Sequence, residues 1–207
     1  MSEQFTRYFA LFSDTQKEKL SKLEQIYVKW NSMINVISRK DMDNFNVHHV
    51  LHSLAIGKII NFLPGTIILD VGTGGGFPGI PLAIMFPDSQ FILLDSIEKK
   101  IKVVSSVASE LQLDNVFPVR KRAEEERGRY DFVVSRAVTE FHKLVRLTEK
   151  NIKQGGFNEI RNGIISLKGG DLNEELKSFK KHIKVWNIND FFEESYFETK
   201  KIVYMEV

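Results

Sequence analysis

A glycine-rich turn directly after an apolar, β-branched run constrains the fold more than any other feature of the chain. The strand-like run Ile67–Val71 leads into the stretch Gly72–Gly79, and the segment Pro78–Phe86 then has a helical pattern. Prolines are tolerated in the first turn of a helix. A strand, a glycine turn and a helix in this order are typical of nucleotide-binding proteins, because glycines let backbone N–H groups approach a ligand at the helix N-terminus.

Two acidic residues accompany this unit and narrow the choice of ligand. Asp70 lies near the end of the first strand, and Asp95 follows a second strand about 20 residues further on, where an acid accepts hydrogen bonds from ribose hydroxyls. A pyrophosphate would need the helix N-terminus free of the negative charge of Asp70. A cationic nucleoside such as S-adenosylmethionine fits better. A dinucleotide-dependent dehydrogenase, whose fingerprint also matches Gly74-x-Gly76-x-x-Gly79, is the alternative.

Strands and helices alternate along the chain, which indicates an α/β fold with a doubly wound, mostly parallel sheet. Strands are predicted at 67–71, 91–94, 116–119, 132–134, 164–167, 183–188 and 201–207. Helices are predicted at 14–30, 47–62, 78–86, 98–111, 140–152 and 171–181. A hairpin of the last two strands would place one antiparallel strand in the sheet. We predict one domain over 1–207, made of an N-terminal helical extension (1–62) and an α/β core (63–207).

Composition favours a soluble, cytoplasmic protein. The 207 residues are 43% hydrophobic and 27% charged. No apolar run approaches the ~20 residues of a membrane span, and the N-terminus does not have the pattern of a signal peptide. The chain has no cysteine, which excludes disulfides, thiolate metal ligands and a cysteine nucleophile. His48, His49 and His52 have no adjacent Glu, and we predict no metal site.

The middle of the chain is basic. Residues 98–153 carry 13 Lys and Arg against 9 Asp and Glu. Such a segment can follow a phosphate backbone, although solvated helix faces give the same pattern. The side chains that we predict to contact RNA are Lys99, Lys100, Arg120, Arg122 and Lys143.

Several motifs together resemble the bacterial 16S rRNA guanine-N7 methyltransferases of the G type, also known as glucose-inhibited division protein B. The resemblance covers nearly the whole chain and is most specific in the Gly-Phe-Pro-Gly-Ile-Pro string that begins at Gly76 and in Ser135-Arg136-Ala137. It includes Lys29–Asn31, His49–Leu54, Leu94–Ser96, Arg122–Glu125 and Leu167–Gly169. The chain departs from the family at His52, where Asp is usual, and at 157–162, which is longer than the usual turn.

This resemblance implies a class I methyltransferase fold, S-adenosylmethionine as the methyl donor and methylation of one guanosine in 16S ribosomal RNA. The substrate would be the RNA or the small ribosomal subunit, and we expect the protein to be a monomer. The cofactor positions of the family correspond to Gly72, Phe77, Asp95, Ser96, Ile97, Ala123, Glu124 and Arg136. The glycine turn itself adds Asp70 and Gly74 to the predicted cofactor contacts.

The missing residue types agree with chemistry at guanine N7. Methylation at carbon 5 of a pyrimidine needs a nucleophile, normally cysteine. Exocyclic amine methyltransferases carry an Asn/Asp-Pro-Pro-aromatic run where this chain has Ser135–Val138. Because N7 already offers a lone pair, we expect no general base, and we predict that Arg136 positions the guanine. A small-molecule methyltransferase, with the N-terminal helices as a lid, is the alternative function.

Overall fold

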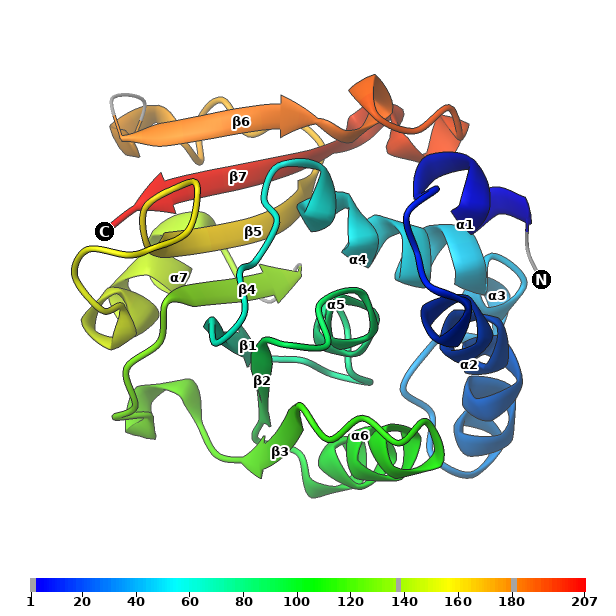
Figure 1. Ribbon diagram of the computed structural model, residues 1–207. Helices are drawn as coiled ribbons and strands as arrows, with labels where there is room; N and C mark the ends of the chain where they lie inside the picture. Colours follow the sequence, from blue (N-terminus) through cyan, green and yellow to red (C-terminus); the bar gives the residue numbers. More distant parts are fainter. Residues whose placement is uncertain (1–2, 137–138, 180–181) are drawn as a thin grey trace.

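A seven-stranded sheet runs through the centre of the computed structural model, which describes residues 3–136, 139–179 and 182–207 (Figure 1). The strands are β1 (Ile67–Val71), β2 (Gln90–Asp95), β3 (Val116–Arg120), β4 (Phe132–Arg136), β5 (Gly163–Gly169), β6 (Ile183–Asn187) and β7 (Lys200–Glu206). Their order is β3-β2-β1-β4-β5-β7-β6, and all neighbours are parallel except the two pairs that involve β7. The predicted α/β class and its one antiparallel strand are confirmed.

The strand order reverses between β1 and β4, and this reversal determines where a ligand can bind. From β1 the chain continues to β2 and β3 on one side, and then returns to β4 on the other. In open α/β sheets, ligands bind beyond the carboxyl ends of the strands at such a switch point. The glycine turn after β1 and Arg136 at the end of β4 therefore face the same crevice.

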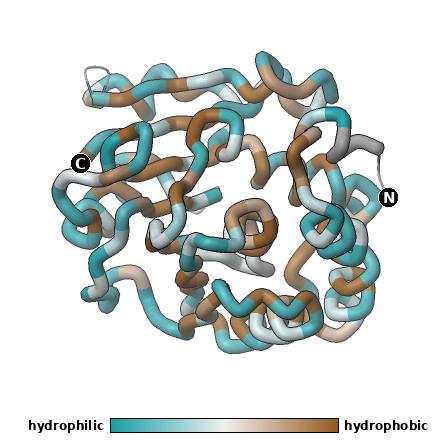
Figure 2. The backbone as a smooth tube through the Cα atoms, viewed as in Figure 1, coloured by the Kyte–Doolittle hydropathy of each residue, from teal (hydrophilic) through white to brown (hydrophobic). Residues whose placement is uncertain are grey.

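Helices cover both faces of the sheet (Figure 1). α5 (Gly79–Met85) and α6 (Glu98–Glu110) pack with the N-terminal helices against one face, and α7 (Phe141–Thr148) packs against the other. α5 is apolar around its whole circumference, as expected for a helix enclosed between a sheet and further helices. Figure 2 shows this concentration of hydrophobic residues in α5 and the central strands. Within the described ranges, no helix has both the length and the apolar character of a membrane span.

The N-terminal helices α1 (Glu3–Tyr8), α2 (Asp14–Met33) and α3 (Arg39–Met42) share one hydrophobic cluster with the sheet. α2 begins at a capping box, in which the Ser13 hydroxyl accepts a hydrogen bond from the Gln16 backbone N–H and the Gln16 side chain accepts one from the backbone N–H of Ser13. The helix predicted from Asp14 is thus confirmed, and it continues beyond Trp30 to Met33.

The α-helix predicted over Val47–Phe62 is only partly correct. The segment begins as a π-helix (Asn46–Leu51), has three α-helical residues in α4 (His52–Leu54), and ends as a 3₁₀-helix (Ala55–Lys58). An apolar pattern does not distinguish these hydrogen-bond registers, because it reports only which side is buried. Short π-helical segments are frequent at functional sites. His48 and His49 of this segment contact Asp41 and Arg136, as described below.

The prediction of an α-helix over 171–181 is wrong for residues 171–179. Residues 180–181 lie outside the described part of the chain. Leu172 and Leu176 do pack against the core, at the helical spacing that suggested a helix. However, one turn after Asp171 gives way to a 3₁₀-helix, Lys177–Phe179. Within the first of these turns, Glu175 accepts hydrogen bonds from Lys168 Nζ (2.7 Å) and from the backbone N–H of Phe141 (2.5 Å).

Candidate cofactor and active site

The glycine turn after β1 is closed by the carboxylate of Asp70. Its Oδ2 accepts hydrogen bonds from the Thr73 hydroxyl (2.6 Å) and from the backbone N–H of Gly79 (2.8 Å), the first residue of α5. A Cβ on Gly79 would lie 2.8 Å from the same oxygen, so that a larger residue would break this contact. Asp70 thereby holds the two ends of the turn together.

Burial makes Asp70 electrostatically unusual. The side chain is fully buried, and its Oδ1 has no hydrogen-bond partner among the described residues. Desolvation raises the pKa of Asp70 to about 7, while the hydrogen bonds from Thr73 and Gly79 and the charge of Arg136 act against this rise. Asp70 therefore supports the turn from within the core of the protein.

Asp95 at the end of β2 holds the glycine turn from the other side. Its Oδ2 accepts a hydrogen bond from the backbone N–H of Gly74 (3.0 Å), and its Oδ1 accepts one from Ile97 N–H (2.9 Å). The ammonium of Lys100 lies 3.5 Å from Oδ2. Each carboxylate oxygen can accept a further hydrogen bond, so Asp95 can still bind a pair of hydroxyl groups.

A cavity of about 460 Å³ opens beside Asp95, beyond the carboxyl ends of β1, β2 and β4. Its lining comprises Val71, Gly72, Leu94, Asp95, Ser96, Ile97, Lys100, Lys121, Arg122, Ala123, Glu124, Arg136, Thr139, Leu144 and Leu147. The predicted cofactor residues Asp70, Gly74 and Phe77 do not line it. Of the predicted RNA contacts, Lys100 and Arg122 line the cavity, whereas Lys99, Arg120 and Lys143 are exposed on α6, β3 and α7.

Phe77 lies in the core rather than at the cavity wall. The ring is 3% exposed, and its centroid is 4.9 Å from that of Tyr27, 5.9 Å from that of Phe45 and 5.1 Å from that of His49. A side chain within a glycine turn can belong to the core here because the N-terminal helices supply a second apolar layer over the turn.

Tyr27 of α2 connects this second layer to the turn directly. Its buried hydroxyl donates a hydrogen bond to the carbonyl of Gly75 (2.6 Å). Gly76 has a φ of +105°, and a Cβ there would lie 2.9 Å from the same hydroxyl. The sequence predicted only that Tyr27 lies in a helix. Nothing in it showed that the side chain would reach a loop 48 residues further along the chain.

Arg136 is held at the end of β4 by the π-helix. Its Nη1 donates to the carbonyl of His48 and its Nη2 donates to Nδ1 of His49, both at 3.0 Å. The guanidinium also lies over the ring of Phe77, 5.0 Å from the centroid. Burial lowers the pKa of Arg136, but an arginine remains charged in proteins. Arg136 is also among the residues that line the cavity, so the π-helix holds a planar cation beside it.

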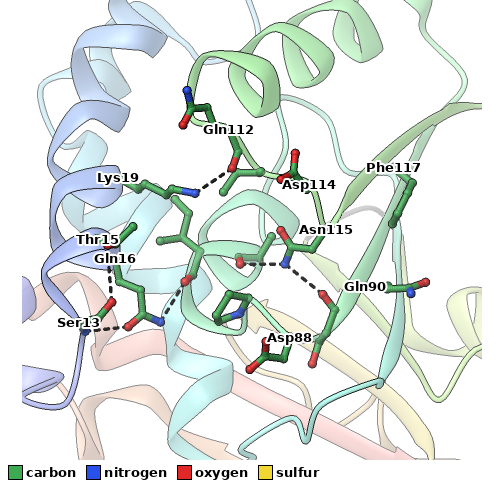
Figure 3. A pocket seen from close by; sticks show the side chains of 15 residues that line it. Ser13, Thr15, Gln16, Lys19, Asp88, Gln90, Gln112, Asp114, Asn115 and Phe117 are labelled. Atoms are coloured by element: carbon green, nitrogen blue, oxygen red, sulfur yellow. Dashed lines mark hydrogen bonds between the residues drawn. The ribbon is translucent and has the colours of Figure 1, made fainter.

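A second cavity, of about 530 Å³, lies at the opposite ends of the strands (Figure 3). Two of its amide side chains bind carbonyls at the end of α5 and just beyond it: Gln16 donates to the carbonyls of Ile84 and Met85, and Asn115 donates to those of Ala83, Phe86 and Ser89. Carbonyls at a helix C-terminus need such partners. Gln16 and Asn115 therefore have a structural role in this cavity, although the cavity is larger than the first.

The departures from the family pattern lie in different places. His52 is buried beneath Tyr196, whose hydroxyl is 3.4 Å from its Nδ1, and desolvation lowers the pKa of His52 well below its usual range. The segment 157–162 lies at the start of β1, where Asn158 Oδ1 accepts a hydrogen bond from the backbone N–H of Leu63 (2.9 Å). The longer segment is therefore at the sheet end opposite the cavity.

The cavity beside Asp95 fits S-adenosylmethionine chemically. Asp95 supplies acceptors for ribose hydroxyls, and backbone groups near Ser96 and Ala123 can pair with the edge of a base. Leu94, Leu144 and Leu147 give the cavity apolar walls. Its volume lies within the range of about 300–1,000 Å³ that is usual for small-molecule sites.

The strand order and the position of this cavity define the class of the protein as a class I S-adenosylmethionine-dependent methyltransferase. Solved structures with the same fold include a SAM-dependent O-methyltransferase from Thermotoga maritima (TM-score 0.60, 15% identity, covering 81% of this chain and 70% of that one). A precorrin-6y C5,15-methyltransferase from Geobacter metallireducens is also similar (TM-score 0.57, 11% identity, covering 84% and 92%). At these identities the likeness concerns the fold alone.

The chain belongs to the rRNA small subunit methyltransferase G family, whose family model matches residues 16–203. It is 52% identical over 203 residues to the ribosomal RNA small subunit methyltransferase G of Christiangramia forsetii, which covers 98% of this chain and 96% of that protein. The protein of the same name from Bacteroides fragilis is 49% identical over 201 residues, with coverage of 97% and 98%. The family resemblance inferred from the sequence is confirmed.

Asp70 and His49 should change the pH dependence of stability in opposite directions. From pH 4 to 7 the folded protein keeps a proton on Asp70 that the unfolded chain has released, so this group lowers the free energy of unfolding as pH rises. The pKa of His49 is lowered to about 4, mainly by burial, so from pH 4 to 6.5 the unfolded chain binds the extra proton and stability rises with pH.

Asp70→Asn should therefore make the free energy of unfolding rise more steeply between pH 4.5 and 6.5, by up to about 1.4 kcal/mol per pH unit. His49→Asn should shift the slope in the other direction. Urea unfolding at a series of pH values measures both slopes. The exposed residue Asp88 provides the control, since Asp88→Asn should leave the slope as it is in the wild type. Equal slopes in all four proteins would contradict the assignment.

Proposed function

We propose that this protein transfers a methyl group from S-adenosylmethionine to N7 of a guanosine in 16S ribosomal RNA. The observation that carries the proposal is the placement of Arg136, a fixed planar cation, beside the cavity that contains Asp95 at the switch point of the sheet. The family to which the chain belongs supports a ribosomal RNA substrate. The cytoplasm, where ribosomal RNA is modified in bacteria, is the corresponding location.

In this proposal the cofactor lies in the cavity of about 460 Å³. Asp95 accepts hydrogen bonds from the ribose hydroxyls, and Gly72, Ser96, Ile97, Ala123 and Glu124 surround the remainder. Asp70, Gly74 and Phe77 act indirectly, because they hold the turn that forms one wall. S-adenosylmethionine supplies a methyl group activated by a sulfonium.

Arg136 positions the guanine in this mechanism. Arginine can donate hydrogen bonds to guanine O6, and its planar fork orients the base as well as attracting it, while the lone pair of N7 stays free to accept the methyl group. Because N7 carries its own lone pair, the protein need not remove a proton before the methyl group is transferred. Catalysis then depends on alignment and on charge stabilisation.

RNA would cross the face that carries the five predicted basic residues. Three of them are paired with acids: Lys100 with Asp95 (3.5 Å), Arg120 with Glu98 (2.8 Å) and Lys143 with Glu140 (2.8 Å). The last two pairs are exposed and so contribute little to stability. A phosphate can replace the acid in such pairs, and we infer that these side chains exchange partners when RNA binds.

The small-molecule alternative is less well supported. It needs a lid over the cavity, and the N-terminal helices were the candidate for that lid. No residue from 3–62 is among those that line the cavity. Instead, the described N-terminal helices pack behind the glycine turn, through Tyr27 and its neighbours. An open site suits a polymeric substrate such as RNA. We propose that the protein binds this RNA as a monomer.

Asp95→Asn should weaken the binding of S-adenosylmethionine. The substitution replaces one of the two acceptors for the ribose by a donor, and an unpaired buried partner costs on the order of 1–3 kcal/mol, or about 5-fold to 150-fold in affinity. Isothermal titration calorimetry measures the change. Asp88→Asn, in the larger cavity of Figure 3, should leave the affinity unchanged. Weakened binding in Asp88→Asn alone would place the cofactor in that cavity instead.

RNA binding should weaken steeply with salt, with a log–log slope of roughly −0.7 for each phosphate neutralised on single strands. Combining Lys99→Glu with Arg120→Glu should flatten this slope without changing cofactor affinity, since neither side chain lines the cavity. Filter binding of a 16S RNA fragment at several salt concentrations measures the slope. Reversing two lysines of α2, Lys19→Glu with Lys22→Glu, is the control with the same change in charge. Equal flattening by both double variants would argue against a defined RNA face.

Arg136→Lys should slow methyl transfer by more than about 10-fold and change the affinity for S-adenosylmethionine much less. Lysine keeps the positive charge and loses the planar fork that orients the base. Single-turnover kinetics with 16S RNA and cofactor titration separate the two effects. N7-methylguanosine is alkali-labile, so borohydride and aniline should cut the product RNA at one site. A methyl group found on an amine or a ribose would exclude N7 chemistry.

A further inference from the structure

A chain of polar side chains runs behind Arg136, away from the cavity. Arg136 Nη2 donates to Nδ1 of His49 (3.0 Å), and Nε2 of His49 lies 2.6 Å from Oδ2 of Asp41. The three residues come from β4, the π-helix and α3. Neither His49 nor Asp41 is among the residues that line the cavity, whereas Arg136 is.

The donors and acceptors of this chain are compatible with only one form of His49. A guanidinium can only donate, so Nδ1 must offer its lone pair to Arg136. The ring proton then lies on Nε2 and is donated to the carboxylate of Asp41. Burial and the neighbouring charge of Arg136 both disfavour a second proton, and the lowered pKa of His49 is consistent with a neutral ring.

A second branch holds Asp41 in place. Its other oxygen, Oδ1, lies 2.5 Å from Nδ1 of His48, and the His48 ring stacks on Tyr196 with centroids 3.8 Å apart. The backbone carbonyl of His48 accepts the remaining bond from Arg136. Both histidines of the π-helix thus contact the same carboxylate, and Arg136 bonds to both residues.

We infer that His49 and Asp41 are positioning residues for the reaction, and that His49, oriented by Asp41, sets the direction of the Arg136 guanidinium. This inference rests on the proposed role of Arg136 at the guanine. Two of the five guanidinium N–H groups bond to the π-helix. That arrangement fixes the plane in which the other three point. A misplacement of about 1 Å at a reacting centre can cost roughly 100-fold in rate.

Two substitutions of His49 test the inference because they retain different halves of the imidazole. Asn places its side-chain oxygen where Nδ1 lies and can still accept from Arg136. Gln places its amide where Nε2 lies, and can still donate to Asp41 but offers no acceptor at the Nδ1 position. We expect His49→Asn to retain kcat within about 5-fold and His49→Gln to lose roughly 10-fold to 100-fold, with KM and cofactor affinity little changed in both.

Unfolding in urea should be measured for both variants, because a purely structural histidine would make kcat follow stability. If His49→Gln equals or exceeds His49→Asn in kcat, the inference is wrong. Asp41→Ala gives a second test that does not alter the buried ring, and should lower kcat by roughly 10-fold. Asp43→Ala is its control, since this nearby acid at the end of α3 is exposed. Equal kcat values for these two variants would also overturn the inference.

A measurement on the free protein separates this inference from the proposed function. ¹⁵N NMR of the histidine rings should show His49 as the Nε2–H tautomer, and Asp41→Ala should alter its Nε2 signal. A proton on Nδ1 would overturn the inference whatever the enzyme methylates. If the wild-type protein leaves 16S RNA unmethylated at N7 and the tautomer is as expected, the proposed function fails and the orientation of Arg136 by His49 stands.

Discussion

The buried carboxylate of Asp70 is the interaction on which the rest of the site depends. One oxygen accepts hydrogen bonds from the turn at Thr73 and from the start of α5 at Gly79, and it does so without solvent. Leaving a charged oxygen in that environment is costly, which the raised pKa of the group reflects. The two hydrogen bonds of Asp70 give the turn a fixed shape, and its outer side faces the cavity.

The N-terminal helices provide the second support. Tyr27 reaches the turn at Gly75, and Phe77 is enclosed between Tyr27, Phe45 and His49. Three elements thus hold the turn: β1 through Asp70, β2 through Asp95 and α2 through Tyr27. A helical segment that resembled an appendage in the sequence is part of the structure that forms the site. The fold therefore combines a cofactor half, common to many methyltransferases, with helices that hold Arg136 and the turn in place.

In the chain of contacts behind Arg136, its guanidinium meets neutral groups first and a carboxylate only beyond them. Its guanidinium bonds to a backbone carbonyl and to an imidazole nitrogen, and the nearest acid in that chain, Asp41, lies beyond the imidazole. A direct salt bridge would neutralise the cation and occupy its N–H groups. An imidazole acceptor fixes the direction of the guanidinium and leaves its charge available to a guanine or to the cofactor.

The sequence by itself determined the strands, the glycine turn, the acids Asp70 and Asp95, and Arg136, because each of these is local: an apolar run, a spacing or a strand end. It also supported the family, through motifs that are contiguous. Only the tertiary structure decided that Asp41, Tyr27 and Tyr196 belong to the site, since their partners lie far along the chain or on another element. It likewise decided the π-helix at His48 and His49 and the loss of the helix after Asp171. Helical periodicity reports which side of a segment is buried. It does not report the backbone hydrogen-bond register. In both segments polar side chains pair with residues of other elements, His48 and His49 with Asp41 and Glu175 with Lys168, and such tertiary contacts can override local propensity.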